Sequence, residues 1–188
     1  MLTTLIWIVV MGFPVSEILL AVFKRAKADA ATVEDRGSMR LLWVVISLSV
    51  VAATVLQGVR VGRVHIPATL LQWFGLSLIL AGLGVRWVSI LTLGRLFTVN
   101  VAIHTDHALV EKGLYRHIRH PSYAGLLLAF LGLGVFFANW LSILVIIVPI
   151  TLAILNRIRR EEAALLAAFG DSYAIYCRRT KRILPGLL

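Results

Sequence analysis

The sequence predicts an all-α integral membrane protein of about five transmembrane helices. Of its 188 residues, 60% are hydrophobic and the mean hydropathy is +0.91, whereas a soluble domain is roughly 45–50% apolar. The apolar residues form long runs separated by short polar segments, and a transmembrane helix needs about 20 mostly apolar residues. The length is that of one domain, so we expect residues 1–188 to form a single membrane domain.

The first three apolar runs each predict one transmembrane helix. They cover residues 1–23, 41–59 and 68–93. Positive charge follows the first run, at Lys24, instead of preceding it as it does in a cleaved signal peptide. We therefore expect the first helix to be retained. Pro67 precedes the third run and suits the first turn of a helix, where its missing N–H costs nothing.

A longer apolar run, residues 126–155, predicts a helical hairpin near the C-terminus. One straight helix over it would span roughly 45 Å, against a hydrocarbon core of about 30 Å. Two helices that turn near residues 138–140, each short for a full span, fit better than one long tilted helix. From Asn156 the chain turns polar, and we expect a separate amphipathic helix there. Its apolar face would carry Leu165, Leu166, Phe169, Tyr173 and Tyr176.

The basic residues predict the orientation of the helices. The segments 24–40, 94–120 and 156–188 contain five, four and seven of the 19 Lys and Arg residues. Because cytoplasmic loops are enriched in these residues, we expect these segments in the cytoplasm, the N-terminus outside, and any active site at the cytoplasmic face. The net charge of +10 is thereby explained by topology and by contact with membrane lipids, and we expect no nucleic-acid partner.

Two polar segments that flank the hairpin carry the candidate chemistry. Residues 113–125 read GLYRHIRHPSYAG, and residues 159–162 read RREE. Arg and His donors suit a ligand carboxylate, and the Glu pair suits a ligand amine or ribose hydroxyls. These residues alone leave S-adenosylmethionine and a nucleotide both open. Four of the five histidines fall in residues 94–120, but no Cys or carboxylate pattern completes a zinc site, and we expect no metal.

The first of these segments resembles a family motif. GLYRHIRHPSYAG is similar to the Gly-x-Tyr-x-x-x-Arg-His-Pro-x-Tyr-x-Gly motif of the isoprenylcysteine carboxyl methyltransferase family. The stretch that begins at His107 and the pair Glu161-Glu162 also resemble that family. The resemblance covers residues 84–187, whereas residues 1–80 match only in hydropathy.

The resemblance implies a cytoplasmic pocket for S-adenosylmethionine in residues 94–188, behind three N-terminal helices in residues 1–93. The residues that it implies for cofactor binding are His107, Leu109, Tyr115, Arg119, His120, Pro121, Tyr123, Gly125, Glu161 and Glu162. The family methylates a carboxylate, which a cationic side chain could hold. Arg86, a charge inside the third apolar run, is our first candidate for this catalytic role, and Arg95 is the second.

The predicted function is therefore methylation of the carboxylate of a lipophilic, isoprenylcysteine-like or prenylated substrate, in a chain that looks like a prokaryotic plasma-membrane relative. Three alternatives remain open at this point. Membrane sterol reductases carry a similar Arg-His-Pro-x-Tyr stretch and bind NADPH, although the Glu pair would repel a phosphate. Phospholipid N-methyltransferases share the cofactor but need an amine acceptor, beside which Arg86 is a poor neighbour. The non-enzymatic alternative is a small membrane scaffold.

Overall fold

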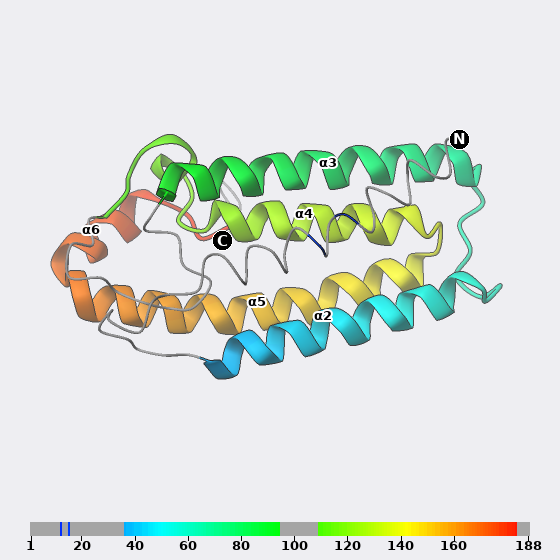
Figure 1. Cartoon of the computed structure of the whole chain (residues 1–188), viewed down its shortest axis with the longest axis horizontal. Coiled ribbons are helices and arrows are strands. Elements are labelled where there is room, and N and C mark those ends of the chain that lie inside the picture. The colour runs from blue at the N-terminus through cyan, green and yellow to red at the C-terminus, as the bar shows by residue number, and fades with distance from the viewer. Residues whose placement is uncertain (1–11, 13–14, 16–35, 95–108, 184–188) are drawn as a thin grey trace.

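The computed structural model describes residues 36–94 and 109–183, together with residues 12 and 15. Within this part, four long helices run side by side, and a 3-10 helix and a short α-helix gather at one end of the bundle (Figure 1). Helix α3 packs on α4, α4 on α5, and α5 on α2. In chain order the elements are α2 (Arg36–Gln57), α3 (Ala68–Leu93), η2 (Gly113–Arg116), α4 (Pro121–Phe136), α5 (Trp140–Phe169) and α6 (Asp171–Arg179).

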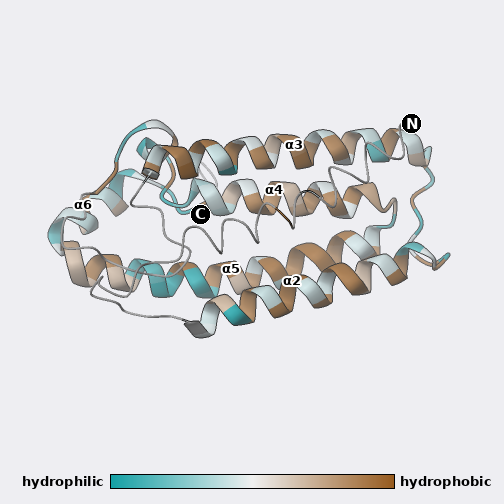
Figure 2. Cartoon of the chain, viewed as in Figure 1, coloured by the Kyte–Doolittle hydropathy of each residue, from teal (hydrophilic) through white to brown (hydrophobic). Residues whose placement is uncertain are grey.

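Three of the helices are long and apolar enough to cross a bilayer, which confirms the predicted membrane fold. They are Gly37–Gln57 within α2, Ala68–Leu93 and Trp140–Phe169. Large apolar side chains on these helices face outward; Leu48 is 65% exposed and Leu91 is 72% exposed, as lipid contact requires. The hydrophobic colour of Figure 2 follows the helices, and the hydrophilic colour collects in the loops and on a stretch of α5 that is separated from α6 by a few apolar turns. The predicted helix over residues 1–23 lies outside the described residues.

The predicted hairpin is confirmed, but its second arm is longer than expected. Helix α4 has 16 residues and is short for a span, as predicted. Helix α5 has 30 residues and continues to Phe169, so the expectation of a short second arm was wrong, and the separate C-terminal helix begins at Asp171 rather than soon after Asn156. No Gly or Pro interrupts residues 150–169, whereas Gly170 has a φ of 51° and ends the helix. Tyr173 and Tyr176 consequently belong to the next helix, α6.

Glycines bring α3 and α4 into backbone contact. A Cβ atom added at Gly82 would lie 2.5 Å from the carbonyl oxygen of Gly125, and one at Gly75 would lie 2.6 Å from that of Gly132. Small residues let membrane helices approach this closely, since lipid gives no hydrophobic force that drives helices together. The two glycine pairs fix the position of α4, whose N-terminus carries the sequence motif.

Asn139 locks the opposite end of the bundle. Its side chain is 2% exposed and donates to the carbonyls of Leu56 and Val61, both at 3.0 Å. Its side-chain oxygen accepts from the backbone N–H of Leu141 and so caps α5. The turn at residues 137–139 between α4 and α5 is thereby fixed to the end of α2 and to the loop that follows it.

Candidate active site

The motif segment is held in place by the last described residues of the chain. Residues 117–120 pair in parallel with residues 181–182: Arg119 N donates to Lys181 O at 2.7 Å and His120 N donates to Arg182 O at 2.9 Å. Pro121 then begins α4, where its lack of an N–H costs no hydrogen bond. The motif therefore lies between α4 and the segment that follows α6.

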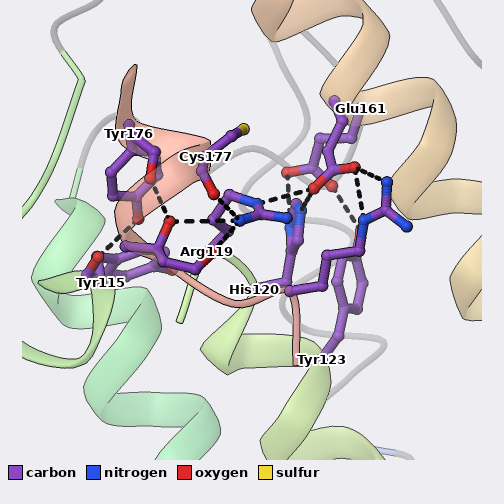
Figure 3. Close-up of polar contacts among 10 residues, drawn as sticks. Tyr115, Arg119, His120, Tyr123, Glu161, Tyr176 and Cys177 are labelled. Atoms are coloured by element: carbon purple, nitrogen blue, oxygen red, sulfur yellow. Dashed lines mark hydrogen bonds and ion pairs between the residues drawn. The ribbon is translucent and has the colours of Figure 1, made fainter. Parts of the chain in front are cut away.

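Glu162 on α5 is held by two arginines. Arg119 Nε donates to its Oε1 at 2.9 Å, and Arg182 Nε donates to its Oε2 at 2.9 Å. Arg119 also donates to the carbonyls of Cys177, at 3.1 Å, and Thr180 at the end of α6. The side chains of Arg119 and Glu162 are only 10% and 12% exposed. This network joins the motif, α5 and α6, and each carboxylate oxygen of Glu162 accepts from an arginine. Figure 3 shows Arg119 beside Cys177 in this network.

His120 lies between the two glutamates and is almost completely buried. Its Nε2 is 3.5 Å from Glu162 Oε1 and its Nδ1 is 4.0 Å from Glu161 Oε1, while its side chain is 4% exposed. Within the described part of the chain, Nε2 has no hydrogen-bond partner. A buried polar atom without a partner is costly, so this nitrogen is a candidate contact for a ligand.

Glu161 belongs to a second chain of contacts. Tyr123 on α4 donates its hydroxyl to Glu161 Oε2 at 3.1 Å, and Arg157 Nε donates to the oxygen of Tyr123 at 2.7 Å. Arg157 NH1 donates in turn to Ser38 Oγ on α2 at 3.0 Å. The Glu161 side chain is 31% exposed, against 12% for Glu162. Of the two adjacent carboxylates, Glu161 is therefore the more accessible to a ligand.

All four tyrosines of the chain lie at this end of the bundle. Tyr176 donates to the backbone carbonyl of Tyr115 at 2.6 Å and ties α6 to η2. Burial raises the pKa of Tyr176 to about 12, and burial and then the nearby Glu161 raise the pKa of Tyr115. Burial also raises the pKa of Tyr173, whose hydroxyl is a second buried atom without a hydrogen-bond partner in the described residues. These hydroxyls therefore stay neutral at physiological pH and can donate hydrogen bonds.

Arg86 reaches the motif from α3. Its NH1 donates to Ser122 Oγ at 2.9 Å, and the residue is 8% exposed. Its charge also acts on Tyr115, where it partly offsets the rise in pKa caused by burial. Gly125, one turn after Ser122, makes this approach possible, because a Cβ atom there would lie 2.6 Å from Arg86 N. A cation buried among membrane helices needs hydrogen-bond partners. Ser122, which accepts from Arg86, is a residue of the motif.

The structure brings together most of the residues that the sequence singled out. The cluster contains Tyr115, Arg119, His120, Pro121, Tyr123, Glu161 and Glu162, with Arg86 beside it. Leu109 lies half-buried before η2. Gly125 faces α3 in the structure, and its predicted role at the cofactor stays a prediction. Arg95 and His107 lie outside the described residues. No group of three or more His, Cys, Asp or Glu residues within the described ranges is arranged to hold a metal ion.

Sequence reasoning missed Arg157, Ser38 and Arg182. A signal for Arg157 was present, because it comes one helical turn before Glu161 at the end of an apolar run. The argument that selected Arg86, a charge inside an apolar helix, applies equally to it. Nothing in the sequence marks Ser38, since its contact depends on how α2 packs on α5.

Comparison with known proteins identifies the family. The profile of the isoprenylcysteine carboxyl methyltransferase (ICMT) family matches residues 74–167, half of the chain. The chain belongs to this family. The matched residues include the motif, α4 and the Glu pair, so the resemblance inferred from the sequence is confirmed.

Individual ICMT relatives match over a similar region. The chain is 36% identical over 114 residues to protein-S-isoprenylcysteine O-methyltransferase B of Arabidopsis thaliana, which is 60% of this chain and 58% of that protein. It is 33% identical to the Schizosaccharomyces pombe enzyme of the same name over 61% of this chain and 49% of that protein. A third relative, 34% identical over 62% of this chain and 55% of that protein, is the cobalt-zinc-cadmium resistance protein CzcN of Cupriavidus metallidurans. The chain thus spans less than two thirds of these relatives.

A solved ICMT structure shares the fold. The eukaryotic intramembrane Ras methyltransferase ICMT superposes with a TM-score of 0.66 at 25% identity, over 95% of this chain and 64% of that one. The similarity therefore extends to helices that lie before the family match, such as α2, where sequence alone indicated only hydropathy.

Proposed function

We propose that the chain is an S-adenosylmethionine-dependent carboxyl O-methyltransferase that acts at the membrane on a lipophilic, isoprenylcysteine-like substrate. The observation that carries the proposal is the cluster in which His120 lies between Glu161 and Glu162 at one end of an ICMT fold. The names of the relatives support a methyl transfer to the carboxylate of an isoprenylcysteine.

The residues of the cluster fit S-adenosylmethionine chemically. The exposed part of the Glu161 carboxylate is a suitable acceptor for an amine or for ribose hydroxyls. His120 Nε2, which lies 3.5 Å from Glu162 Oε1, and the Tyr173 hydroxyl are buried and make no hydrogen bond within the described residues, so both are available to a polar ligand. Glu162 has a different role in this proposal: Arg119 and Arg182 occupy both of its oxygens, so it positions the motif rather than binding the cofactor directly.

The chemistry requires positioning rather than a strong base. When bound, S-adenosylmethionine supplies an electrophilic methyl group on a sulfonium. The accepting carboxylate is already ionised at neutral pH, so the protein has to hold its oxygen in line and exclude bulk water. Arg86, buried beside Ser122, is the described cation best suited to hold that carboxylate. In this scheme Tyr115 and Tyr123 remain neutral and line the cofactor side.

The membrane determines how the two reactants arrive. The cofactor is water-soluble and would enter from the cytoplasm, where the positive-inside rule places the polar end. The lipophilic substrate would enter sideways between helices, from the bilayer. The division of the chain into an N-terminal part, 1–93, and a catalytic part, 94–188, is part of the same proposal.

Two measurements on detergent-purified protein test the proposal. Calorimetry should detect saturable binding of S-adenosylmethionine, weakened by Glu161→Ala, and no binding of NADPH. Incubation with methyl-labelled S-adenosylmethionine and N-acetyl-S-farnesylcysteine should give a labelled product that releases methanol in base, as a carboxyl methyl ester does. A base-stable product on phosphatidylethanolamine would favour the N-methyltransferase, binding of NADPH alone would favour the reductase, and no binding of either would favour a scaffold.

A further inference from the structure

A series of hydrogen bonds runs from Ser38 to Glu161 and joins three helices. It contains a buried cation to which the proposed mechanism gives no role. Arg157 is 2% exposed. It lies on α5 and donates to Tyr123 on α4 and to Ser38 on α2. A buried guanidinium is costly unless its donors are satisfied, and here the partner of its Nε is the tyrosine that contacts Glu161.

The donor chemistry of arginine fixes the direction of these hydrogen bonds. A guanidinium only donates, whereas a tyrosine hydroxyl has one proton to donate and can also accept. Because Arg157 donates to the oxygen of Tyr123, the Tyr123 proton is directed to Glu161. The carboxylate oxygen Oε2 of Glu161 is thereby held, and Oε1, which is 4.0 Å from His120 Nδ1, is left for other contacts.

We infer that Arg157 is a positioning residue that sets the Tyr123–Glu161 hydrogen bond and that Ser38 on α2 fixes Arg157 for this task. The inference rests on the proposed function, since it assigns the held Glu161 carboxylate to binding of S-adenosylmethionine. A glutamate side chain has several rotatable bonds, and holding it before the ligand arrives removes part of the entropy cost of binding. Ser38 lies outside the residues that match the ICMT profile, so α2 contributes to the site through this contact.

A pair of serine variants tests the role of α2. Ser38 and Ser142 are both buried, and each takes part in a hydrogen bond between α2 and α5; Ser142 Oγ donates to Ala53 O at 3.1 Å. Ser38→Ala should raise the Kd for S-adenosylmethionine about three- to tenfold, the effect of one lost hydrogen bond. Ser142→Ala, far from the site, should lower the melting temperature similarly and leave the Kd unchanged. Equal Kd values for the two variants would overturn the inference.

Substitutions at Arg157 test the direction of the hydrogen bond. Arg157→Lys keeps a cationic donor with no acceptor, but one ammonium cannot reach both Tyr123 and Ser38 as the guanidinium does, so it should weaken binding about as much as Ser38→Ala. Arg157→Gln introduces an amide oxygen that competes for the Tyr123 proton, and should weaken binding about tenfold beyond the lysine variant. Arg159→Lys, at an exposed position of the same helix, is the control. A lysine variant as weak as the glutamine variant would show that Arg157 acts only through packing and would refute the role.

A double-mutant cycle separates failure of this inference from failure of the proposed function. Ser38→Ala and Tyr123→Phe should be non-additive in melting temperature, because Arg157 links the two groups. If the wild-type protein binds no S-adenosylmethionine, the proposed function fails, and the cycle still tests the link. Additive effects would overturn the link whatever ligand the site binds.

Discussion

Replacing Arg119 by lysine should destabilise the protein even though the charge is conserved. Arg119 uses its planar fork to reach Glu162 Oε1 with Nε and the carbonyls of Cys177 and Thr180 with NH1. A lysine ammonium is a single point charge and cannot make these contacts in the same arrangement. We expect the lysine to keep the ion pair with Glu162 and to leave the two carbonyls at the end of α6 without their donor.

The size of the effect follows from these two contacts. Hydrogen bonds that involve a charged group contribute on the order of 1.5–3 kcal/mol each, so the loss of these two part-buried contacts is about 3–6 kcal/mol. For a chain of this length, 1 kcal/mol lowers the melting temperature by about 2–4 °C. Arg119→Lys should therefore melt about 6–24 °C below the wild-type protein in the same detergent.

The control is another arginine at the same end. Arg179 pairs with Glu111 at 2.9 Å, but the two side chains are 60% and 38% exposed, and exposed pairs contribute little. Arg179→Lys should change the melting temperature by no more than about 2 °C. If the two lysine variants melt within about 2 °C of each other, the hydrogen bonds of Arg119 do not join the motif to α5 and α6.

Three further predictions concern the helix contact, the tyrosines and the substrate cation. Gly82→Ala places a Cβ atom 2.5 Å from a backbone oxygen of α4 and should lower the melting temperature by several degrees, whereas Gly84→Ala, with nothing within 4 Å of its Cβ, should not lower it. Burial raises the pKa of Tyr176 from 10.0 to about 12, so the neutral hydroxyl stabilises the fold fully below pH 10 and this contribution is lost as the pH rises through 12. The difference in absorbance at 295 nm between the wild type and Tyr176→Phe should therefore titrate near pH 12. A midpoint near pH 10 would contradict the burial of this hydroxyl. Arg86→Lys should raise the KM for the carboxylate substrate more than the Kd for S-adenosylmethionine, and a change in the Kd alone would assign Arg86 to the cofactor.

The sequence predicted the fold where hydropathy and turn residues determine it. The runs at 41–59 and 68–93 became α2 and α3, and the turn at residues 138–140 separates α4 from α5. The length of α5 was mispredicted because charged residues were taken as the end of a helix. In the structure Arg157, Glu161 and Glu162 are paired with residues of other elements at the polar end, and the helix ends at Gly170, which has a positive φ.

The candidate site was predictable as a set of residues but not as a set of contacts. The motif and the Glu pair each resemble a pattern of a known family. They are distant in sequence, and the structure brings them together. The pairing of residues 117–120 with 181–182 and the contact of Ser38 with Arg157 join segments that are distant in sequence. No local pattern encodes them, because they depend on how the helices pack.

The contrast between Glu161 and Glu162 shows how packing separates two residues that the sequence presents as equivalent. Successive residues of a helix point about 100° apart, so Glu162 faces Arg119 and Arg182 while Glu161 faces Tyr123. Each oxygen of the Glu162 carboxylate accepts from an arginine and the side chain is 12% exposed, whereas the Glu161 side chain is 31% exposed. We therefore expect Glu162→Gln to act mainly on the melting temperature and Glu161→Gln mainly on the Kd for S-adenosylmethionine. The reverse pattern would assign ligand binding to Glu162 and would require the Arg119 and Arg182 contacts to open when the ligand binds.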